Sequence, residues 1–257
     1  MGPSTISLDQ NHTIFDGHLG QLKEHSHAVI ALLFGLERPF DLWTSDGQRS
    51  VRFALVPAAV NHQLNFFGAR TLVLYVEPHD PAYAALHRRA QGLCLETEIL
   101  SPAFVDGLEQ WQQHQDPGHI LRAVEAMYAT DAPPLDERVV RLAAAFNQGL
   151  LLNAEMDEMS HHVASSPSRL QHVLKAELGV GIRRLKQHYR FKIAVATVAA
   201  GGSLTVAAHR AGFSDSAHLS RAFSETFGLN PAKVLIRSVN WLVAPSLRNS
   251  DSMKAVV

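Results

Sequence analysis

The sequence of 257 residues predicts an α+β protein, with a strand-rich N-terminal part and an all-helical C-terminal part. Three observations carry this prediction. Short apolar runs bounded by turn residues continue up to Glu77, helical patterns replace them from Pro81 onward, and the balance of charge reverses near Asp136. The length suits one large domain or two modest ones.

The overall composition excludes several classes of protein. With 46% hydrophobic and 18% charged residues, 16 glycines and 12 prolines, the chain matches neither collagen, nor a coiled coil, nor a disordered protein. No apolar run approaches the ~18 residues of a membrane span, and residues 1–10 lack the basic opening and apolar core of a secretory signal. The single cysteine, Cys94, allows neither an internal disulfide nor a multi-thiolate metal site. We therefore expect a cytoplasmic protein.

The charge divides at the Pro-containing stretch 131–135, which we expect to be a linker. Residues 1–135 carry 8 basic and 15 acidic side chains, whereas residues 136–257 carry 15 basic and 9 acidic ones, so the two parts stand at −7 and +6. A positive excess confined to one part indicates a polyanion such as DNA as its partner. The alternative is a chance imbalance between two solvated surfaces.

The N-terminal part shows buried strands followed by helices. Strands are expected at the apolar runs 29–34, 51–56 and 71–76, each of which is bounded by Gly, Pro, Asp or Asn. Helical patterns follow at 81–91, 102–112 and 118–129. We expect residues 1–80 to form one sheet domain and residues 81–130 a helical segment.

The C-terminal part contains an internal repeat with an offset of 49 residues. An apolar stripe at i, i+3, i+4 and i+8, followed by glycine, occurs first as Leu170, Val173, Leu174, Leu178 and Gly179, and again as Leu219, Ala222, Phe223, Phe227 and Gly228. Glycine after such a stripe supplies the left-handed end of a helix. Each copy therefore predicts one amphipathic helix with a polar outer face.

Short segments before each stripe complete two helix-turn-helix motifs. Polar residues at 165–168 and 214–216 offer N-cap side chains, and shorter helices are expected upstream at 154–163 and 204–211. The first motif spans about 154–178 and the second about 204–227. A helix over 181–200 joins them at a fixed separation, so one chain can reach two adjacent major grooves, which lie ~34 Å apart on B-DNA.

The second motif carries the residues of a known family. Gly-Phe-Ser at 212–214, Phe223, Phe227-Gly228 and Pro231 fall in register within the segment 203–231, which resembles the second helix-turn-helix of AraC/XylS-type bacterial transcription regulators. Residues 136–237 resemble their whole DNA-binding domain, including Ser166-Pro-Ser-Arg-Leu-Gln-His-Val-Leu-Lys175 in the first motif. The resemblance implies an effector-controlled transcription regulator that binds promoter DNA, contacts RNA polymerase and can form a homodimer.

Side chains off the two apolar stripes are the candidate DNA-binding residues: Ser168, Arg169, Gln171, His172 and Lys175, then Ser216, Ala217, His218, Ser220 and Arg221. Their chemistry separates their roles. Arg221 can bind guanine O6 and N7 through two hydrogen bonds, Gln171 can pair with adenine N6 and N7, and Ala217 can meet a thymine methyl group. For each residue the alternative is an ordinary exposed side chain.

Basic residues without such selectivity suit the phosphates, which give affinity and register rather than sequence information. Lys175, Arg190 and Lys192 are the candidates. The first motif also departs from the second, because Val163 stands where the second motif has Gly212, and two carboxylates, Asp157 and Glu158, lie on its preceding helix. A β-branched residue tolerates a left-handed turn poorly, so we expect weaker DNA binding by the first motif.

In this family the N-terminal domain usually responds to an effector, and here residues 1–80 resemble a cupin-like β-barrel. The matching residues are Gly20, His25-Ser-His27 and Pro57-Ala-Ala-Val-Asn-His62. Alternation along a strand places His25 and His27 on one side, and the resemblance brings His62 to them from a neighbouring strand. Three neutral imidazoles suit Zn²⁺, Ni²⁺, Co²⁺ or Fe²⁺.

The match to a metal-binding cupin is partial. The glutamate usual after the His-x-His pair is missing, since Ala31 and Leu32 stand there. Water or Cys94 could complete a three-histidine site, and the alternatives are an organic-effector pocket lined by these histidines or hydrogen-bonded core residues. A metal-dependent cupin enzyme with an appended DNA-binding domain is the competing function, disfavoured by the missing carboxylate and by the lack of a catalytic constellation.

Two segments leave their roles open. The helical segment 81–130 holds, by resemblance, the dimer contact, and packing against the open side of the barrel is the alternative. The candidates are Leu108, Trp111, Ile120, Leu121, Val124 and Met127. Residues 238–257 show no clear pattern and are left as a tail without assignment.

Overall fold

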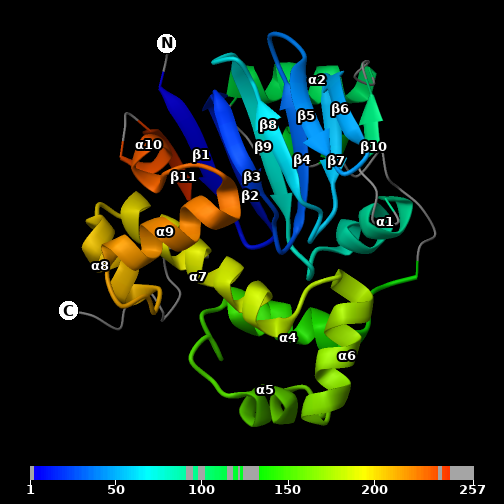
Figure 1. Ribbon diagram of the computed structural model, residues 1–257, viewed down its shortest axis with the longest axis vertical. Coiled ribbons are helices and arrows are strands. Elements are labelled where there is room, and N and C mark those ends of the chain that lie inside the picture. The colour runs from blue at the N-terminus through cyan, green and yellow to red at the C-terminus, as the bar shows by residue number, and fades with distance from the viewer. Residues whose placement is uncertain are drawn as a thin grey trace.

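The structure is a computed structural model that describes residues 3–90, 95–97, 102–114, 118–120, 122–123, 133–236 and 239–243. Strands form the upper part of the molecule in Figure 1 and a bundle of helices the lower part. The predicted α+β class is therefore confirmed.

The strands form two sheets that face each other as a flattened barrel (Figure 1). The larger sheet has the order β10-β7-β4-β9-β2-β1-β11, and the smaller has the order β3-β8-β5-β6. The strands are β1 Ser4–Leu8, β2 His12–His18, β3 Gln21–His25, β4 Ile30–Gly35, β5 Phe40–Thr44, β6 Gly47–Val51, β7 Phe53–Val56, β8 His62–Asn65, β9 Arg70–Val76, β10 Leu95–Thr97 and β11 Val239–Val243.

The central strands β4 and β9 are buried on both faces. Side chains alternate along a strand, so Ile30, Leu32 and Phe34 point to the outer face, while Ala31 and Leu33 point into the barrel. This explains their nearly continuous apolar runs. The outer face is covered by helices and the inner face encloses the barrel interior.

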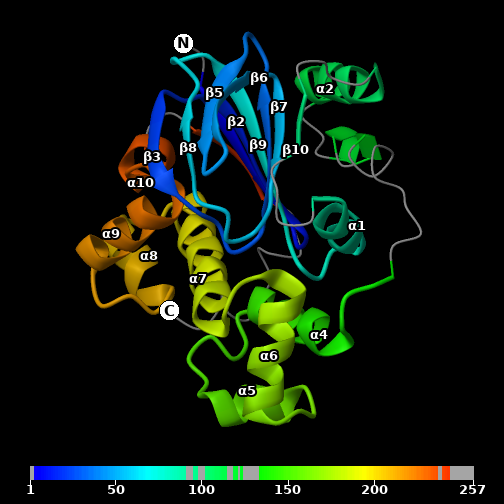
Figure 2. The same cartoon turned by 45° about the vertical axis from the view of Figure 1, so that its right-hand side comes forward.

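Two helices, α1 Pro81–Ala90 and α2 Pro102–His114, lie on the outer face of the larger sheet (Figure 2). Phe104 of α2 stacks on Phe34 with ring centroids 3.9 Å apart, and the Trp111 indole donates a 2.8 Å hydrogen bond to Asp16. Trp111 and Ile120 are fully buried and Leu108 nearly so. These three residues therefore pack on the protein's own core, and the expected dimer contact is wrong for them; Leu121, Val124 and Met127 lie outside the described residues.

The C-terminal part is helical from Asp136, whose side chain caps α4. Ser166 and Asp215 cap the two recognition helices, and Gly179 and Gly228 end them with φ angles of 70° and 69°. These are the local signals that the repeat predicts. The helices are α4 Glu137–Asn147, α5 Met156–His162, α6 Pro167–Leu178, α7 Ile182–Ala199, α8 Leu204–Arg210, α9 Ser216–Phe227 and α10 Pro231–Leu235.

The turn of the first motif differs from the expectation. Val163 does not take the left-handed conformation, because its φ is −103° and its side chain is buried. The left-handed residue is Ala164, with φ 51°, whereas the second motif uses Gly212 at φ 78°. Moving the turn by one residue places a small methyl group where a branched side chain would be more strained.

The two parts of the chain are joined by a buried charge cluster. Glu77, which follows β9, accepts hydrogen bonds from His188 at 3.1 Å and pairs with Lys192 at 2.9 Å, both on α7. Burial would raise the pKa of Glu77, but Lys192 and His188 beside it hold that pKa well below its usual range. Arg184 of α7 also donates to the carbonyl of Ser26 in the barrel at 2.8 Å.

This cluster corrects one of the expected phosphate contacts. The side chain of Lys192 is only 10% exposed and is engaged with Glu77, so it faces the barrel rather than DNA. Arg190 is half-buried and donates to the carbonyl of Leu152 at 3.0 Å, between α4 and α5, and its phosphate contact stays a prediction. Sequence periodicity separates a polar from an apolar face of a helix, but the polar face of α7 is itself partly buried against another domain.

The segment 238–257, left as a tail by the sequence, contributes a strand. Residues 239–243 form β11, which pairs in parallel with β1, so that Ile6 lies opposite Trp241. Together with β10, this strand extends the sheet domain beyond the predicted boundary at residue 80. These five residues are too few to show the alternation of apolar and polar side chains that predicts a strand. Their partner strand also lies more than 230 positions away in the sequence. Across the described ranges, no helix is long and apolar enough to span a membrane.

Removal of β11 should destabilise the protein measurably. A chain ending at residue 237 loses one of the two partners of β1, which then pairs with β2 alone, and the half-buried side chains of Val239, Trp241 and Val243. We expect a loss of about 2 kcal/mol, which lowers the Tm by roughly 4–8 °C. Thermal unfolding followed by circular dichroism measures this, with a chain ending at residue 243 as the control. Equal Tm values for the two truncated chains would contradict the role of β11.

Replacement of Glu77 should destabilise the protein in a pH-dependent way. Glu77→Gln leaves Lys192 charged and unpaired in a buried interface, so we expect a loss of about 2–4 kcal/mol at pH 7. The folded-state pKa of Glu77 lies below the unfolded value of about 4.3, so its contribution is complete above that pH and is lost as the pH falls. Urea unfolding at pH 7, 5 and 3.5 should show the difference from wild type narrowing. The exposed Glu24→Gln serves as the control, and a difference independent of pH would refute the assignment.

Candidate functional site

The first recognition helix, α6, presents its predicted side chains to solvent. Ser168, Arg169, Gln171, His172 and Lys175 are all exposed, while the stripe residues Leu170, Leu174 and Leu178 are fully buried. Lys175 donates a 2.7 Å hydrogen bond to the carbonyl of Gly179, at the end of its own helix. The polar face of α6 is therefore open to a partner.

The second recognition helix, α9, is also exposed over its first two turns, but some of its polar side chains already form hydrogen bonds within the motif. Ala217 and Arg221 are exposed. Ser220 donates its hydroxyl hydrogen to the carbonyl of Ser216 at 2.7 Å, and the His218 ring lies 3.1 Å from the Ser214 hydroxyl and edge-on to Phe213. His218 and Ser220 therefore already support the motif itself, which leaves Arg221 as its main polar reading group.

A polar groove between α7 and α9 adds basic residues that the sequence reasoning did not assign to DNA. Arg183 is exposed at the start of α7 and shares this groove with Arg221. The signal available in the sequence was the position of Arg183 on the polar face of the linking helix. The groove is lined by Gly181, Arg183, Arg184, Gln187, His218, Arg221, Ala222 and Glu225.

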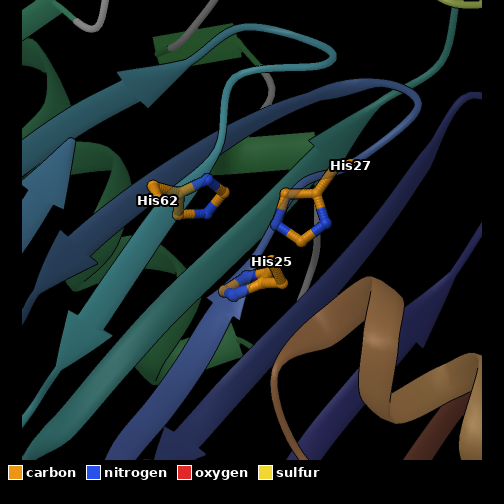
Figure 3. A group of neighbouring side chains, drawn as sticks. All are labelled: His25, His27 and His62. Carbon is orange, nitrogen blue, oxygen red and sulfur yellow. The ribbon is translucent and has the colours of Figure 1, made fainter. Parts of the chain in front are cut away.

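Inside the barrel, three histidines converge (Figure 3). His25 ends β3, His62 begins β8, and the two are direct partners in the antiparallel pairing of these strands. Alternation predicted His25 and His27 on one strand, and this prediction is wrong. β3 ends at His25, and His27 lies in the following loop. The loop nevertheless returns its ring to within 5.1 Å of His62 and 4.8 Å of His25, between ring centroids.

Hydrogen bonds to backbone carbonyls fix the state of two of these rings. Nδ1 of His25 bonds the carbonyl of Lys23 at 2.6 Å, and Nδ1 of His62 bonds the carbonyl of Val60 at 2.9 Å. A carbonyl accepts only, so each Nδ1 carries the hydrogen and each Nε2 keeps a free lone pair. Nε2 of His25, Nε2 of His62 and Nδ1 of His27 are buried without a hydrogen-bond partner.

Burial keeps the cluster uncharged. Desolvation lowers the pKa of His62 to about 3, lowers that of His25, and, together with the neighbouring His25 and His62, holds the pKa of His27 well below its usual range. Buried polar atoms without partners are rare in folded proteins. The three free nitrogens of this cluster are therefore available to a ligand or to a buried water molecule.

The donor set fits a transition metal. Metal-bound histidines commonly donate their second ring nitrogen to a carbonyl, as His25 and His62 do here. One ring nitrogen from each of the three histidines lies within 4.8 Å of those of the other two. Imidazole nitrogens bound to one Zn²⁺ lie about 3.3 Å apart, so the rings would have to approach one another by up to about 1.5 Å. Cys94, considered as a further ligand, lies outside the described residues.

An apolar cavity of about 100 Å³ adjoins the histidines. Barrel strands supply one wall, and helices of the C-terminal part supply the other. The polar groups along it are few: Thr13, His25, His27 and Tyr75 from the barrel, and His188 and Lys192 from α7. The apolar lining includes Ile6, Leu8, Phe15, Leu22, Leu33, Leu64 and Val73 from the barrel, and Phe191, Val195, Phe223, Phe227 and Leu235 from the helices.

Comparison with known proteins identifies relatives of this chain. Residues 159–237 match the family described as a helix-turn-helix domain. The chain is 29% identical over 166 residues to the arabinose operon regulatory protein of Escherichia coli K12, a match that covers 61% of this chain and 52% of the relative. The protein of the same name from Salmonella typhimurium is 27% identical over 119 residues, covering 44% and 41%. The chain thus spans about half the length of the curated relatives it matches.

Solved structures of ToxT from Vibrio cholerae share the fold over nearly the whole chain. An apo form with a single substitution matches with a TM-score of 0.64 at 12% identity, covering 90% of this chain and 99% of that one. The form bound to an unsaturated fatty acid matches with a TM-score of 0.59 at 13% identity, covering 89% and 96%. At such identity the likeness shows the architecture, a sheet domain followed by a helical domain. Together with the exposed recognition helices, the family match shows that residues 159–237 are a helix-turn-helix domain.

Proposed function

We propose that the protein is a sequence-specific DNA-binding transcription regulator whose activity is set by a ligand in the barrel cavity. The observation that carries the effector site is the set of unpartnered polar atoms around the cavity. Thr13 Oγ1, His25 Nε2 and His27 Nδ1 are buried without a hydrogen bond, and all three residues line it. The relatives that support DNA binding are themselves regulatory proteins.

Two classes of effector suit this site. A divalent transition metal, Zn²⁺, Ni²⁺, Co²⁺ or Fe²⁺, would be held by His25, His27 and His62, with Nε2 of His25 and of His62 already free. A small organic molecule would lie in the apolar cavity with its polar end toward His188 and Lys192. ToxT, the structural neighbour, has been solved with an unsaturated fatty acid and with (E)-4-(8-methylnaphthalen-1-yl)but-3-enoic acid, both apolar molecules with one acid group.

The size of the cavity separates these occupants. An apolar cavity of about 150 Å³ accommodates benzene, whereas the cavity here is about 100 Å³. A metal ion with bound water fits the present volume. A long-chain acid would have to enlarge the cavity, and the movable wall is the one that α7, α9 and α10 provide. Binding of a large effector would thus displace the helical part from the barrel.

The competing enzyme function has less support. Glu77, the carboxylate of the sheet domain that contacts α7, is fully engaged with His188 and Lys192 and is not free to act as an acid or base. The regulator would act in the cytoplasm with promoter DNA and RNA polymerase as partners. A homodimer would need a surface other than the buried faces of α1 and α2.

Substitutions on the recognition helices should separate base reading from phosphate binding. Arg221→Ala removes a side chain that can bind guanine through two hydrogen bonds, so we expect a loss of about 1–3 kcal/mol and a relaxed preference at one base pair. Lys175→Ala should weaken binding to all sequences alike and reduce the salt dependence. Wild type first selects its site from random DNA, and fluorescence anisotropy with single-base variants of that site measures both effects. A uniform loss for both variants would contradict the assignment of Arg221.

The histidine cluster should bind one transition metal ion per chain. Calorimetric titration of Zn²⁺, Ni²⁺ and Co²⁺ into metal-free protein, with elemental analysis, is expected to show one site that His62→Ala abolishes, because two imidazoles and water bind less tightly than three imidazoles. His161→Ala, which removes an exposed histidine of α5, is the control. Absence of a stoichiometric site in wild type would exclude the metal and leave the organic effector.

Thermal stabilisation by an unsaturated fatty acid, lost in the cavity-filling Val73→Phe, would then identify that class.

A further inference from the structure

The two helix-turn-helix motifs belong to different hydrophobic cores. Buried residues of the first motif, such as Leu170 and Leu174, cluster with the outer face of the larger sheet and with α1 and α2. Buried residues of the second motif, such as Leu219 and Phe223, cluster with the interior of the barrel. The linking helix α7 spans both cores. The apolar lining of the cavity is drawn from the second core, so a ligand there touches the core of one motif and not that of the other.

The recognition helix of the second motif ends directly on the strand that carries His25. The carbonyl of Gly228, which follows α9, accepts a 3.0 Å hydrogen bond from the backbone N–H of Lys23 in β3. A Cβ at position 228 would lie 2.5 Å from the carbonyl oxygen of Lys23 and 2.7 Å from Nδ1 of His25. Such separations are well inside van der Waals contact, so glycine is required here for the close approach as well as for its φ of 69°.

The adjacent Phe227 extends this contact to the ligand site. Its ring lies 5.6 Å from that of His27 and 5.8 Å from that of Tyr75, between centroids. A movement of His25 or His27 on ligand binding is therefore transmitted first to the end of α9.

The corresponding glycine of the first motif makes no such approach. Gly179 has nearly the same φ, 70°, but a Cβ there would meet the Ala58 carbonyl at 3.8 Å, which is ordinary contact. The repeat therefore offers two glycines with the same backbone conformation and the same place in the motif. Of these two, only Gly228 is in close contact with the barrel.

The second motif is also attached to the barrel beyond α9. Val234 and Leu235 of α10 line the cavity, and β11 then pairs with β1, whose Ile6 and Leu8 line the same cavity. Residues of α9 and α10 thus form part of the wall of the ligand site. We propose that Gly228 is the positioning residue through which the barrel sets the orientation of the second motif, and that ligand occupancy adjusts the second motif while the first keeps its place. This inference rests on the proposed regulator function.

The matched pair Gly228→Ala and Gly179→Ala tests this directly. Both substitutions introduce the same backbone strain, because alanine disfavours a positive φ. Only Gly228→Ala adds a clash with β3. Hydrogen exchange measured by mass spectrometry should show segments 19–25 and 216–229 exchanging about tenfold faster in Gly228→Ala than in Gly179→Ala. Exchange in segment 167–178 should be the same in Gly228→Ala as in wild type. Footprinting on the selected DNA site should show Gly228→Ala losing protection mainly in the half bound by the second motif.

Equal exchange in the two variants, or equal loss over both halves of the DNA site, would overturn the proposal. If wild type bound no DNA, the regulator function would fail while the exchange data still decided the docking. Should Gly228→Ala not fold, Phe227→Leu removes the ring contacts to His27 and Tyr75 without backbone strain. It is expected to accelerate exchange in the same two segments, and wild-type exchange in them would count against the proposal.

Discussion

The buried carboxylate of Glu77 is the interaction on which the relation between the two parts of the molecule depends. Taking a carboxylate out of water is costly unless partners compensate, and both compensating partners, His188 and Lys192, lie on α7 of the other part. The barrel can bury Glu77 only when α7 is docked in one register. Such pairs contribute more to the uniqueness of a geometry than to net stability. On separation the three groups would be hydrated again, which lowers the cost of opening the interface.

The position of this cluster explains why the cavity matters. His188 and Lys192 pair with Glu77 and also line the cavity, so an occupant with a charged end competes for the same groups that hold the parts together. An occupant at the three histidines acts instead at the end of β3, on which α9 rests. Both routes lead to α7 and α9. The first motif is held by other contacts, among them the 2.7 Å hydrogen bond from Lys186 of α7 to the carbonyl of Ala154.

The helical part was predictable because its signals are local. The stripe, the caps at Ser166 and Asp215 and the terminal glycines all act within one or two helical turns, and the observed helices differ from the expected ones by one or two residues. The sheet was predictable only where strands are buried on both faces, as in β4 and β9. Short strands that are largely exposed to solvent, such as β6, show no run of apolar residues in the sequence. The pairing of β11 with β1 joins distant segments and also has no local sequence signal. The histidine cluster was reached through resemblance, although the alternation argument failed because His27 lies beyond the strand. The pairing of Lys192 with Glu77 could not be foreseen, since it joins residues on separate domains.

The exposure of the recognition helices limits how a ligand can act. Gln171 and Arg221 are exposed while the barrel is docked, so the barrel does not cover the surface that would read DNA. Control by simple occlusion is therefore inconsistent with this arrangement. What the docked barrel does fix is the position of α9 relative to α6. The helix that separates them, α7, has 18 residues and is about 27 Å long, while adjacent major-groove faces lie about 34 Å apart. Two short motifs at the ends of a rigid helix tolerate little error in relative orientation, so a small rotation of one motif is sufficient to change affinity for a two-part site.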